Sequence, residues 1–284
     1  MSAKTIFVTG VTGNLGSATA RHLLKNGVHV KGLTRNASSA KAGQLKEAGA
    51  EIIQGNLDDP SSYSDHLKGA DGLFCLLTYV NGVKKEVKQG MDLVNEAKKQ
   101  GIKHFLYSSV IGADASTGIP IWESKNEIEN RLKQSGLNYT IIRPASFYDN
   151  FLFPQVKSRL LKGKLVTPVH KDKIQQHISG EDIGRISASI FMNPEKYFGR
   201  TINLASREAD GVMLAETFSK VWGKPVNYQH LPGFITRLVM GKNLYTMFKW
   251  VNNNDACFVK DIEACKKEFP GMLSLEDWIK GYFK

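Results

Sequence analysis

The chain has 284 residues, 42% of them apolar and 23% charged, with a formal net charge of +11. This balance is ordinary for a globular protein and argues against extensive disorder. The apolar runs are too short to cross a bilayer, and the N-terminus shows no signal peptide, so we expect a cytoplasmic protein without a membrane partner. The three cysteines match no zinc or disulfide framework, so we expect no metal site.

The positive charge is distributed along the chain. Lysines are interleaved with acids, as in Lys84-Lys85-Glu86, which indicates a solvated face. No basic run with interleaved aromatic residues appears, so the sequence carries no nucleic-acid-binding motif. The excess charge then serves solubility or the steering of anionic ligands.

The first 150 residues alternate short apolar runs with helical patterns. The expected strands are Thr5–Val8, Val28–Leu33, Glu51–Gln54, Gly72–Leu77, His104–Tyr107 and Tyr139–Ile142. The expected helices are Leu15–Lys25, Ser39–Ala48, Ser61–Leu67, Lys84–Lys99 and Ile121–Gln134. Glycine follows four of these helices, which is typical of a left-handed cap, at Gly27, Gly49, Gly101 and Gly136. This rhythm predicts an α/β fold with a Rossmann-type doubly wound parallel sheet, whose ligands bind at the carboxyl ends of the strands.

The rhythm changes after Pro144. An aromatic-rich stretch leads to a capped helix start at Ser179, a strand at Thr201–Leu204 and a helix around Leu214–Val221. We therefore expect residues 1–150 to form the Rossmann domain and residues 151–284 a smaller, interwoven α+β substrate or partner region. A segment near residues 178–205 is expected to return to the Rossmann core.

A glycine-rich loop, Gly10-Val11-Thr12-Gly13-Asn14-Leu15-Gly16, follows the first strand and opens the first helix. Glycines let the chain turn sharply and let its backbone approach a pyrophosphate, which rests on the helix N-terminus. We assign Gly10, Thr12, Gly13, Asn14, Leu15 and Gly16 to a dinucleotide site. The alternative is a glycine-rich turn that binds no ligand.

The end of the second strand distinguishes NADP from NAD. An NAD site usually places an acid there to bind the ribose 2′-hydroxyl. This chain has Arg35 and Asn36 and no acid. Arginine offers a planar, charged fork for a 2′-phosphate, so we expect NADP(H). The alternative is a surface arginine beside the site.

Lys125 lies on the apolar stripe of the helix at 121–134, four residues after Ile121 and three before Ile128. A lysine on an inward face is costly without a partner, such as ribose hydroxyls or a phosphate. The alternative is a lysine that snorkels from the edge of the stripe. Ser108 and Ser109 end the fifth strand, on the rim where ligands bind, or they only cap a turn.

At this point a family resemblance is visible. The chain resembles the NmrA-like branch of the atypical short-chain dehydrogenase/reductase superfamily, and is similar to isoflavone reductases and bacterial NADPH-dependent quinone oxidoreductases. The matching segments cover nearly the whole chain: Val8–Gly16, Thr34–Asn36, Gly55–Asp59, Ser124–Glu129, Ser135–Pro144, Phe147, Asn150, His177–Gly184 and Gly223–Tyr228.

The resemblance implies roles for individual residues. It implies that Arg35 meets the 2′-phosphate, that Asn56 and Leu57 flank the adenine, and that Lys125 binds the nicotinamide ribose. It also implies that the segment Pro144–Asn150 borders the nicotinamide, with Pro144, Phe147 and Asn150 as its contacts. We add Leu77, Thr78 and Ser108, at the ends of two expected strands, to the cofactor site.

One departure from the superfamily concerns the proton donor. Ordinary members use Tyr-x-x-x-Lys, with the tyrosine as acid, but Ile121 stands four residues before Lys125. Three alternatives stay open: Lys125 is the catalytic acid, the acceptor takes its proton from water, or there is no turnover. Tyr79, Tyr107 and Tyr148 are substitutes for the missing acid, or packing aromatics.

Two functions follow from these alternatives. The first is an NADPH-dependent oxidoreductase that transfers hydride to a quinone-like or other conjugated small-molecule acceptor. The second is a non-catalytic NADP(H)-binding redox sensor that acts through a regulatory protein partner. A binding module that does not need the cofactor is a third. Phe234, Tyr245, Phe248 and Trp250 line an apolar pocket or belong to the core. The sequence leaves the oligomeric state open, a homodimer included.

Overall fold

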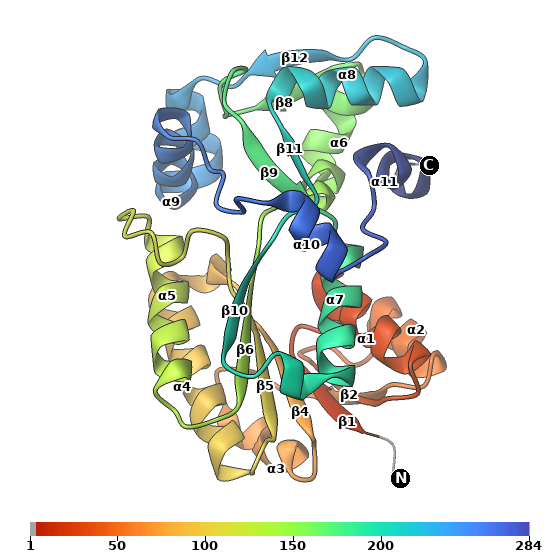
Figure 1. Ribbon diagram of the computed structural model, residues 1–284, viewed down its shortest axis with the longest axis vertical. Coiled ribbons are helices and arrows are strands. Elements are labelled where there is room, and N and C mark those ends of the chain that lie inside the picture. The colour runs from red at the N-terminus through yellow and green to blue at the C-terminus, as the bar shows by residue number, and fades with distance from the viewer. Residues whose placement is uncertain (1–3, 284) are drawn as a thin grey trace. The chain divides into compact units, whose positions relative to one another are not determined.

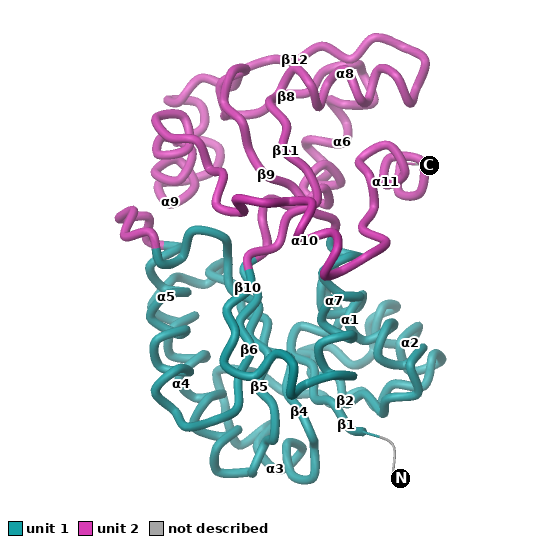
Figure 2. The backbone as a smooth tube through the Cα atoms, viewed as in Figure 1, with its two compact units in different colours: residues 1–114, 121–143, 180–202 teal, residues 115–120, 144–179, 203–284 magenta. Residues whose placement is uncertain are grey.

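The computed structural model describes residues 4–283, which form two compact units interleaved along the chain (Figures 1 and 2). The first unit comprises residues 1–114, 121–143 and 180–202, and the second comprises residues 115–120, 144–179 and 203–284. The expectation about an N-terminal signal peptide falls partly on residues 1–3, which lie outside the described residues.

The first unit is built on a seven-stranded sheet in the order β10-β6-β5-β4-β1-β2-β3. The strands are β1 (Thr5–Val8), β2 (His29–Thr34), β3 (Glu51–Gln54), β4 (Gly72–Leu76), β5 (His104–Ser108), β6 (Tyr139–Pro144) and β10 (Arg200–Leu204). Neighbouring strands from β3 to β6 pair in parallel. The strand order reverses between β1 and β4, the switch point at which such sheets bind ligands. The predicted Rossmann-type α/β fold is therefore confirmed.

Two features of this unit differ from the elements expected within residues 1–150: the sheet has a seventh strand, and one helix is broken in two. The strand predicted at Thr201–Leu204 is β10, and it joins the sheet beside β6 as a seventh strand. The helix expected at 61–67 is broken into a 3₁₀ turn, η1 (Pro60–Ser62), and a short α3 (Ser64–Leu67). Asp59 accepts a hydrogen bond from the Ser61 amide and Pro60 follows it, so the turn begins one residue early and closes tightly.

Four of the remaining helices of the first unit start and end within one or two residues of the sequence pattern: α1 (Asn14–Lys25), α2 (Ala40–Glu47), α4 (Val83–Lys99) and α5 (Pro120–Lys133). Helix α7 (Gly180–Met192) begins directly after the predicted capped start at Ser179, and the 3₁₀ turns η2 (Tyr79–Asn81) and η4 (Pro194–Lys196) were not predicted. The four capping glycines have left-handed backbones, with φ between 71° and 100°. Glycine reaches this conformation without the steric cost that a side chain would add.

Helix α1 is fixed by its contact with α7. Gly184 lets the two backbones meet, because a Cβ there would lie 2.6 Å from the Ala18 Cβ. Glu181 adds ion pairs from α7 to Arg21 at 2.7 Å and His22 at 2.8 Å, and the His22 hydrogen bond is the main cause that lowers the Glu181 pKa to about 2. These contacts set the position of the α1 N-terminus.

The second unit holds two small sheets and the C-terminal helices. One sheet has the order β11 (Arg207–Ala209), β9 (Gln175–Ile178), β7 (Ser146–Phe147), and the other pairs β12 (Asn227–His230) in parallel with β8 (Lys164–Thr167). Its helices are η3 (Tyr148–Leu152), α6 (Pro154–Leu161), α8 (Gly211–Trp222), α9 (Gly233–Asn253), α10 (Ile262–Glu268) and α11 (Leu275–Tyr282). Its core centres on aromatic residues, with Phe218 and Trp278 fully buried.

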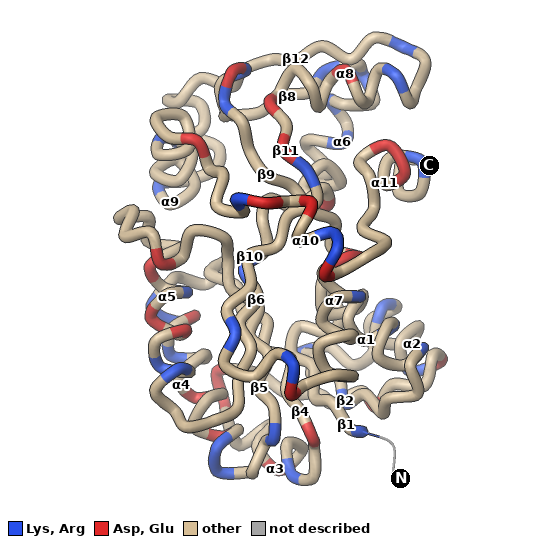
Figure 3. Tube along the Cα trace, in the orientation of Figure 1, with Lys and Arg blue, Asp and Glu red and all other residues tan. Residues whose placement is uncertain are grey.

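The charged residues are spread over both units (Figure 3). Within residues 4–283, no helix combines the length and apolarity that a membrane crossing needs. The same residues contain no cluster of three His, Cys, Asp or Glu side chains suited to a metal ion.

Candidate functional site

The glycine-rich loop joins the end of β1 to the start of α1. Gly10 has a left-handed backbone (φ 61°), and the Gly13 amide donates to the Gly10 carbonyl at 2.9 Å, which closes the turn. Thr9 is fully buried, and its hydroxyl bonds the Leu76 amide and carbonyl, so the loop is fastened to the end of β4. Gly13 then caps α1 with no side chain.

Two of the loop glycines are required for different reasons. A Cβ at Gly16 would lie 2.1 Å from the Gly10 carbonyl oxygen, so only glycine lets the helix start pack under the turn. A Cβ at Gly13 would lie 3.2 Å from the same oxygen, and Gly13 is exposed. Gly16 therefore shapes the loop, whereas Gly13 leaves its outer surface bare. A bare surface beside the positive end of a helix dipole, with no acid in the first turn, is suited to phosphate.

The ends of β2 and β3 carry the residues assigned to the adenosine half of a dinucleotide. Arg35 is exposed directly after β2 and forms no ion pair with a described carboxylate, and Thr34 contacts Thr12 of the loop at 3.4 Å. Asn56 follows β3, where its amide donates to the Ser62 hydroxyl, and Leu57 is partly buried beside it. These residues and the loop lie at the carboxyl edge of one sheet, where Arg35 would offer a 2′-phosphate a positive charge.

The ends of β4 and β5 carry the next assigned residues. Leu77 is buried, and Thr78 is exposed and caps η2 by accepting a hydrogen bond from the Val80 amide. Ser108 is the last residue of β5, with 1% of its surface exposed, and its hydroxyl has no hydrogen-bond partner within residues 4–283. An unpaired buried hydroxyl at a strand end is suited to bind a ligand group.

Lys125 extends from α5 to the same edge. Its side chain is 11% exposed, and its ammonium lies 2.7 Å from a Glu86 carboxylate oxygen, with a longer contact of 3.4 Å to the Leu77 carbonyl. The ammonium also lies 5.8 Å from the centre of the Tyr107 ring. The inward position predicted for Lys125 is therefore observed. Its protein partner is a buried carboxylate, which the sequence analysis did not identify.

Glu86 corrects the interpretation of Lys84-Lys85-Glu86 as a solvated face. Glu86 is fully buried, and its second oxygen accepts a hydrogen bond from the Ser124 hydroxyl at 2.9 Å. The helical period contains the signal that was missed, because Glu86 lies four residues before Gly90 and seven before Leu93, on the buried face of α4.

A second buried carboxylate organises the neighbouring part of the sheet. Glu129 of α5 holds Arg143 through paired hydrogen bonds of 2.8 and 2.5 Å and accepts the Ser109 hydroxyl at 2.6 Å. Arg143 also meets Asp114 at 2.6 Å. Ser109 was assigned with Ser108 to the ligand rim, but its hydroxyl is bonded within this network. Of the two serines, only Ser108 has a hydroxyl without a partner among the described residues.

The three tyrosines considered as proton donors differ in placement. Tyr107 and Tyr148 are fully buried, and burial raises the pKa of Tyr107 well above its ordinary value. Tyr148 packs in the second unit, between His177 and Trp278. Tyr79 is half-buried in η2, with a pKa raised by burial. Ile121 is buried, so the position four residues before Lys125 supplies no acid.

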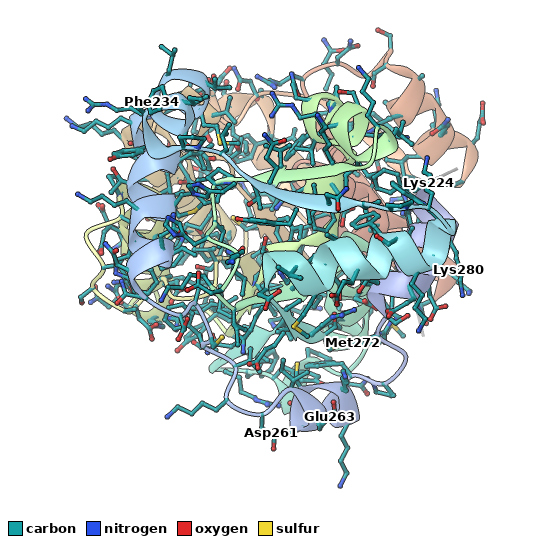
Figure 4. All side chains as sticks on the ribbon, turned by 90° about the horizontal axis from the view of Figure 1, so that it is seen from above. Lys224, Phe234, Asp261, Glu263, Met272 and Lys280 are labelled. Atoms are coloured by element: carbon teal, nitrogen blue, oxygen red, sulfur yellow. The ribbon has the colours of Figure 1, made fainter. Side chains whose placement is uncertain are left out.

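The residues assigned to the nicotinamide side belong to the second unit. Pro144 ends β6 and is buried, Phe147 lies in β7, and Asn150 lies in η3, both partly exposed. The aromatic residues proposed for an apolar pocket lie in different places. Tyr245 and Phe248 line a cavity, whereas Trp250 stacks on Phe258. Phe234 is 76% exposed and points outward (Figure 4), because the first turn of α9 leaves that face uncovered.

Comparison with known proteins identifies the family of the chain. The NmrA-like family model matches residues 2–279. The chain belongs to the NmrA-like family. A similar relative is the NAD(P)H azoreductase of Xenophilus azovorans, 28% identical over 223 residues, which cover 78% of this chain and 76% of that protein.

Two solved structures share the fold of the NmrA-like chain. The NADPH-dependent quinone oxidoreductase of Escherichia coli, in complex with NADPH, has a TM-score of 0.81 at 22% identity, covering 98% of this chain and 100% of that one. NmrA, a negative transcriptional regulator in complex with NADP, has a TM-score of 0.80 at 21% identity, covering 100% of this chain and 96% of that one. At these identities the likeness shows the fold, and function has to be argued from the site.

Proposed function

We propose that this protein is an NADPH-dependent oxidoreductase that transfers hydride to a quinone-like or other conjugated small-molecule acceptor. The observation that carries the proposal is the Lys125 ammonium, fixed by Glu86 and the Leu77 carbonyl at the strand edge that also holds the glycine-rich loop. Leu76 connects the two, because it ends β4 beside Leu77 and its side chain lies against Gly10. The similarity to an azoreductase and to a quinone oxidoreductase structure supports a conjugated acceptor.

The residues of the first unit fit three parts of NADP(H). The bare amide end of α1, with Gly13 and Asn14, would bind the pyrophosphate, and Arg35 would bind the 2′-phosphate. Ser108 and Lys125 would bind the ribose on the nicotinamide side. When bound, the cofactor supplies the hydride, whereas these residues bind and orient it.

Glu86 gives Lys125 its orientation. A lysine side chain has many rotamers, and one carboxylate contact at 2.7 Å with little exposure confines the ammonium to a small volume. This fixed position favours orientation of the ribose. With isoleucine at position 121, the acceptor oxygen would take its proton from Lys125 or from water.

The competing function is an NADP(H)-binding regulator with a protein partner. Two observations favour it: Ile121 replaces the usual acid, and the regulator NmrA shares the fold. Both functions use the same cofactor site, so cofactor binding alone does not separate them.

The experiment is to follow NADPH absorbance with the purified protein and a panel of quinones, azo dyes and aldehydes. The proposal expects acceptor-dependent oxidation with at least one quinone or dye, and a rate that falls in Arg35→Ala at subsaturating NADPH. NADPH binding without oxidation across the panel would favour the regulator.

A further inference from the structure

A cavity of about 200 Å³ lies in the second unit, and none of its lining residues is assigned to the cofactor. Its walls come from both halves of α9, from the segment that follows β8 and from the last residue of β12. Both halves of α9 border this half-open cavity, and Gly241 interrupts the helix between them with a left-handed backbone (φ 80°). A cavity of about 150 Å³ is known to hold benzene, so this one has room for a substituted aromatic ring.

Two histidines lie where the parallel strands β8 and β12 end. Thr167 and His230 are register partners at the last position of each strand, and His170 follows three residues after Thr167. The rings of His170 and His230 meet edge to face, with centres 4.4 Å apart. The carboxyl ends of this small sheet therefore place two imidazoles at one wall of the cavity.

Hydrogen bonds between the wall segments hold the walls in place. The Asn252 side chain accepts from the His170 amide at 2.8 Å and donates to the Pro168 carbonyl at 2.9 Å. Behind them Val169 and Val251 are buried together, with Phe248 packed against them. The cavity is therefore formed before a ligand enters, which lowers the entropic cost of binding.

Four polar side chains at the cavity have no partner among the described residues. The side chains of His230, Tyr245, Lys249 and Asn253 have no hydrogen-bond or ion-pair partner within residues 4–283, and no carboxylate is among the lining residues. A few convergent donors beside an aromatic wall are typical of a ligand site. Lys249, an exposed cation with no acid among the lining residues, favours an anionic ligand group.

We propose that this cavity binds a small aromatic carboxylate or sulfonate, with its ring against Phe248 and its anionic group toward Lys249. This site does not depend on the cofactor or on turnover. The probe is benzenesulfonate, titrated into the cofactor-free full chain and followed by amide NMR shifts. We expect saturable shifts at Gly233 and Asn253, and at least tenfold weaker binding of the neutral isostere benzenesulfonamide.

A matched pair of lysine substitutions tests the charge. Lys249→Met is expected to weaken benzenesulfonate binding about tenfold, while Lys242→Met, exposed on the same helix but outside the cavity, leaves it unchanged. Because both lysines are exposed, both variants should fold. Equal losses in the two variants would mean diffuse surface attraction, and equal binding of the sulfonamide would mean an apolar cavity without anion selection. Either result, or shifts that do not saturate, overturns the proposal.

Discussion

The Lys125 ammonium lies 2.7 Å from the carboxylate of Glu86, a residue with no exposed surface. Ser124, the neighbour of Lys125 on α5, donates to the other oxygen of the same carboxylate. Both ends of this ion pair are taken out of bulk water, so each residue depends on the other. Any substitution of Lys125 therefore also removes the ion-pair partner of Glu86.

This dependence determines how Lys125 is best substituted. Lys125→Met leaves Glu86 buried without its cation, and breaking a buried pair from one side is expected to cost about 3–5 kcal/mol of unfolding free energy. The double variant Glu86→Gln/Lys125→Met removes both charges and should recover most of that loss. Urea denaturation of the two variants measures the difference. If Lys125→Met is as stable as the unmutated protein, the pair is not coupled in solution.

The same double variant isolates the role of the ammonium. It should fold, yet bind NADPH more weakly and lose any turnover, because the group that would orient the ribose is gone. Cofactor titration and steady-state kinetics measure both effects. Unchanged affinity and unchanged activity would remove Lys125 from the site.

Arg35 is expected to set the cofactor preference. Arg35→Ala should weaken NADPH binding by about 1.5–3 kcal/mol, roughly ten- to a hundredfold, through loss of a charge-assisted contact, and leave NADH binding nearly unchanged. Arg237→Ala, an exposed arginine of the second unit, is the control. Equal affinities of the unmutated protein for NADPH and NADH would contradict the assignment.

Substitutions at the two loop glycines, Gly13 and Gly16, should have different effects on cofactor binding and on the fold. Gly13→Val is expected to abolish cofactor binding and keep the fold, because its side chain would project from the exposed face of the loop. Gly16→Ala should distort the loop itself, since its Cβ would lie 2.1 Å from a backbone oxygen. Circular dichroism, thermal unfolding and cofactor titration together separate the two. A Gly13→Val protein that binds normally would place the phosphates elsewhere.

His104 should make the first unit sensitive to mild acid. Burial lowers the pKa of His104 from 6.5 to about 4, and its Nε2 lies 2.8 Å from the Thr140 hydroxyl. The unfolded chain takes up the proton first, so this contribution to stability is complete above pH 6.5 and is lost as the pH falls from 6.5 toward 4. The loss is at most about 3 kcal/mol. His104→Phe should flatten this part of the stability–pH curve; an unchanged curve would contradict the buried neutral histidine.

The sequence predicted the fold and the shape of the loop because both depend on local rules. Apolar periodicity and capping glycines lie within one element, and the glycine spacing of residues 10–16 is a property of one turn. Glu86 was missed because its burial depends on the face of α4 that meets α5. Its two neighbouring lysines suggested a surface, whereas the spacing to Gly90 and Leu93 indicated the buried face.

The aromatic segment 234–250 was harder to predict for another reason. It is one helix by composition, but Gly241 interrupts it, so Phe234 and Phe248 meet different surroundings. A helical wheel drawn through the break assigns both to one face. Sequence alone does not show whether a glycine within a helical pattern is tolerated or bends the chain.

The most direct test of the proposed function is single-turnover oxidation of bound NADPH on addition of a quinone. The account predicts that NADPH absorbance disappears in proportion to the quinone reduced, in the unmutated protein and not in the Glu86→Gln/Lys125→Met variant. Bound NADPH that persists with every quinone and dye of the panel, in a folded protein, would contradict it.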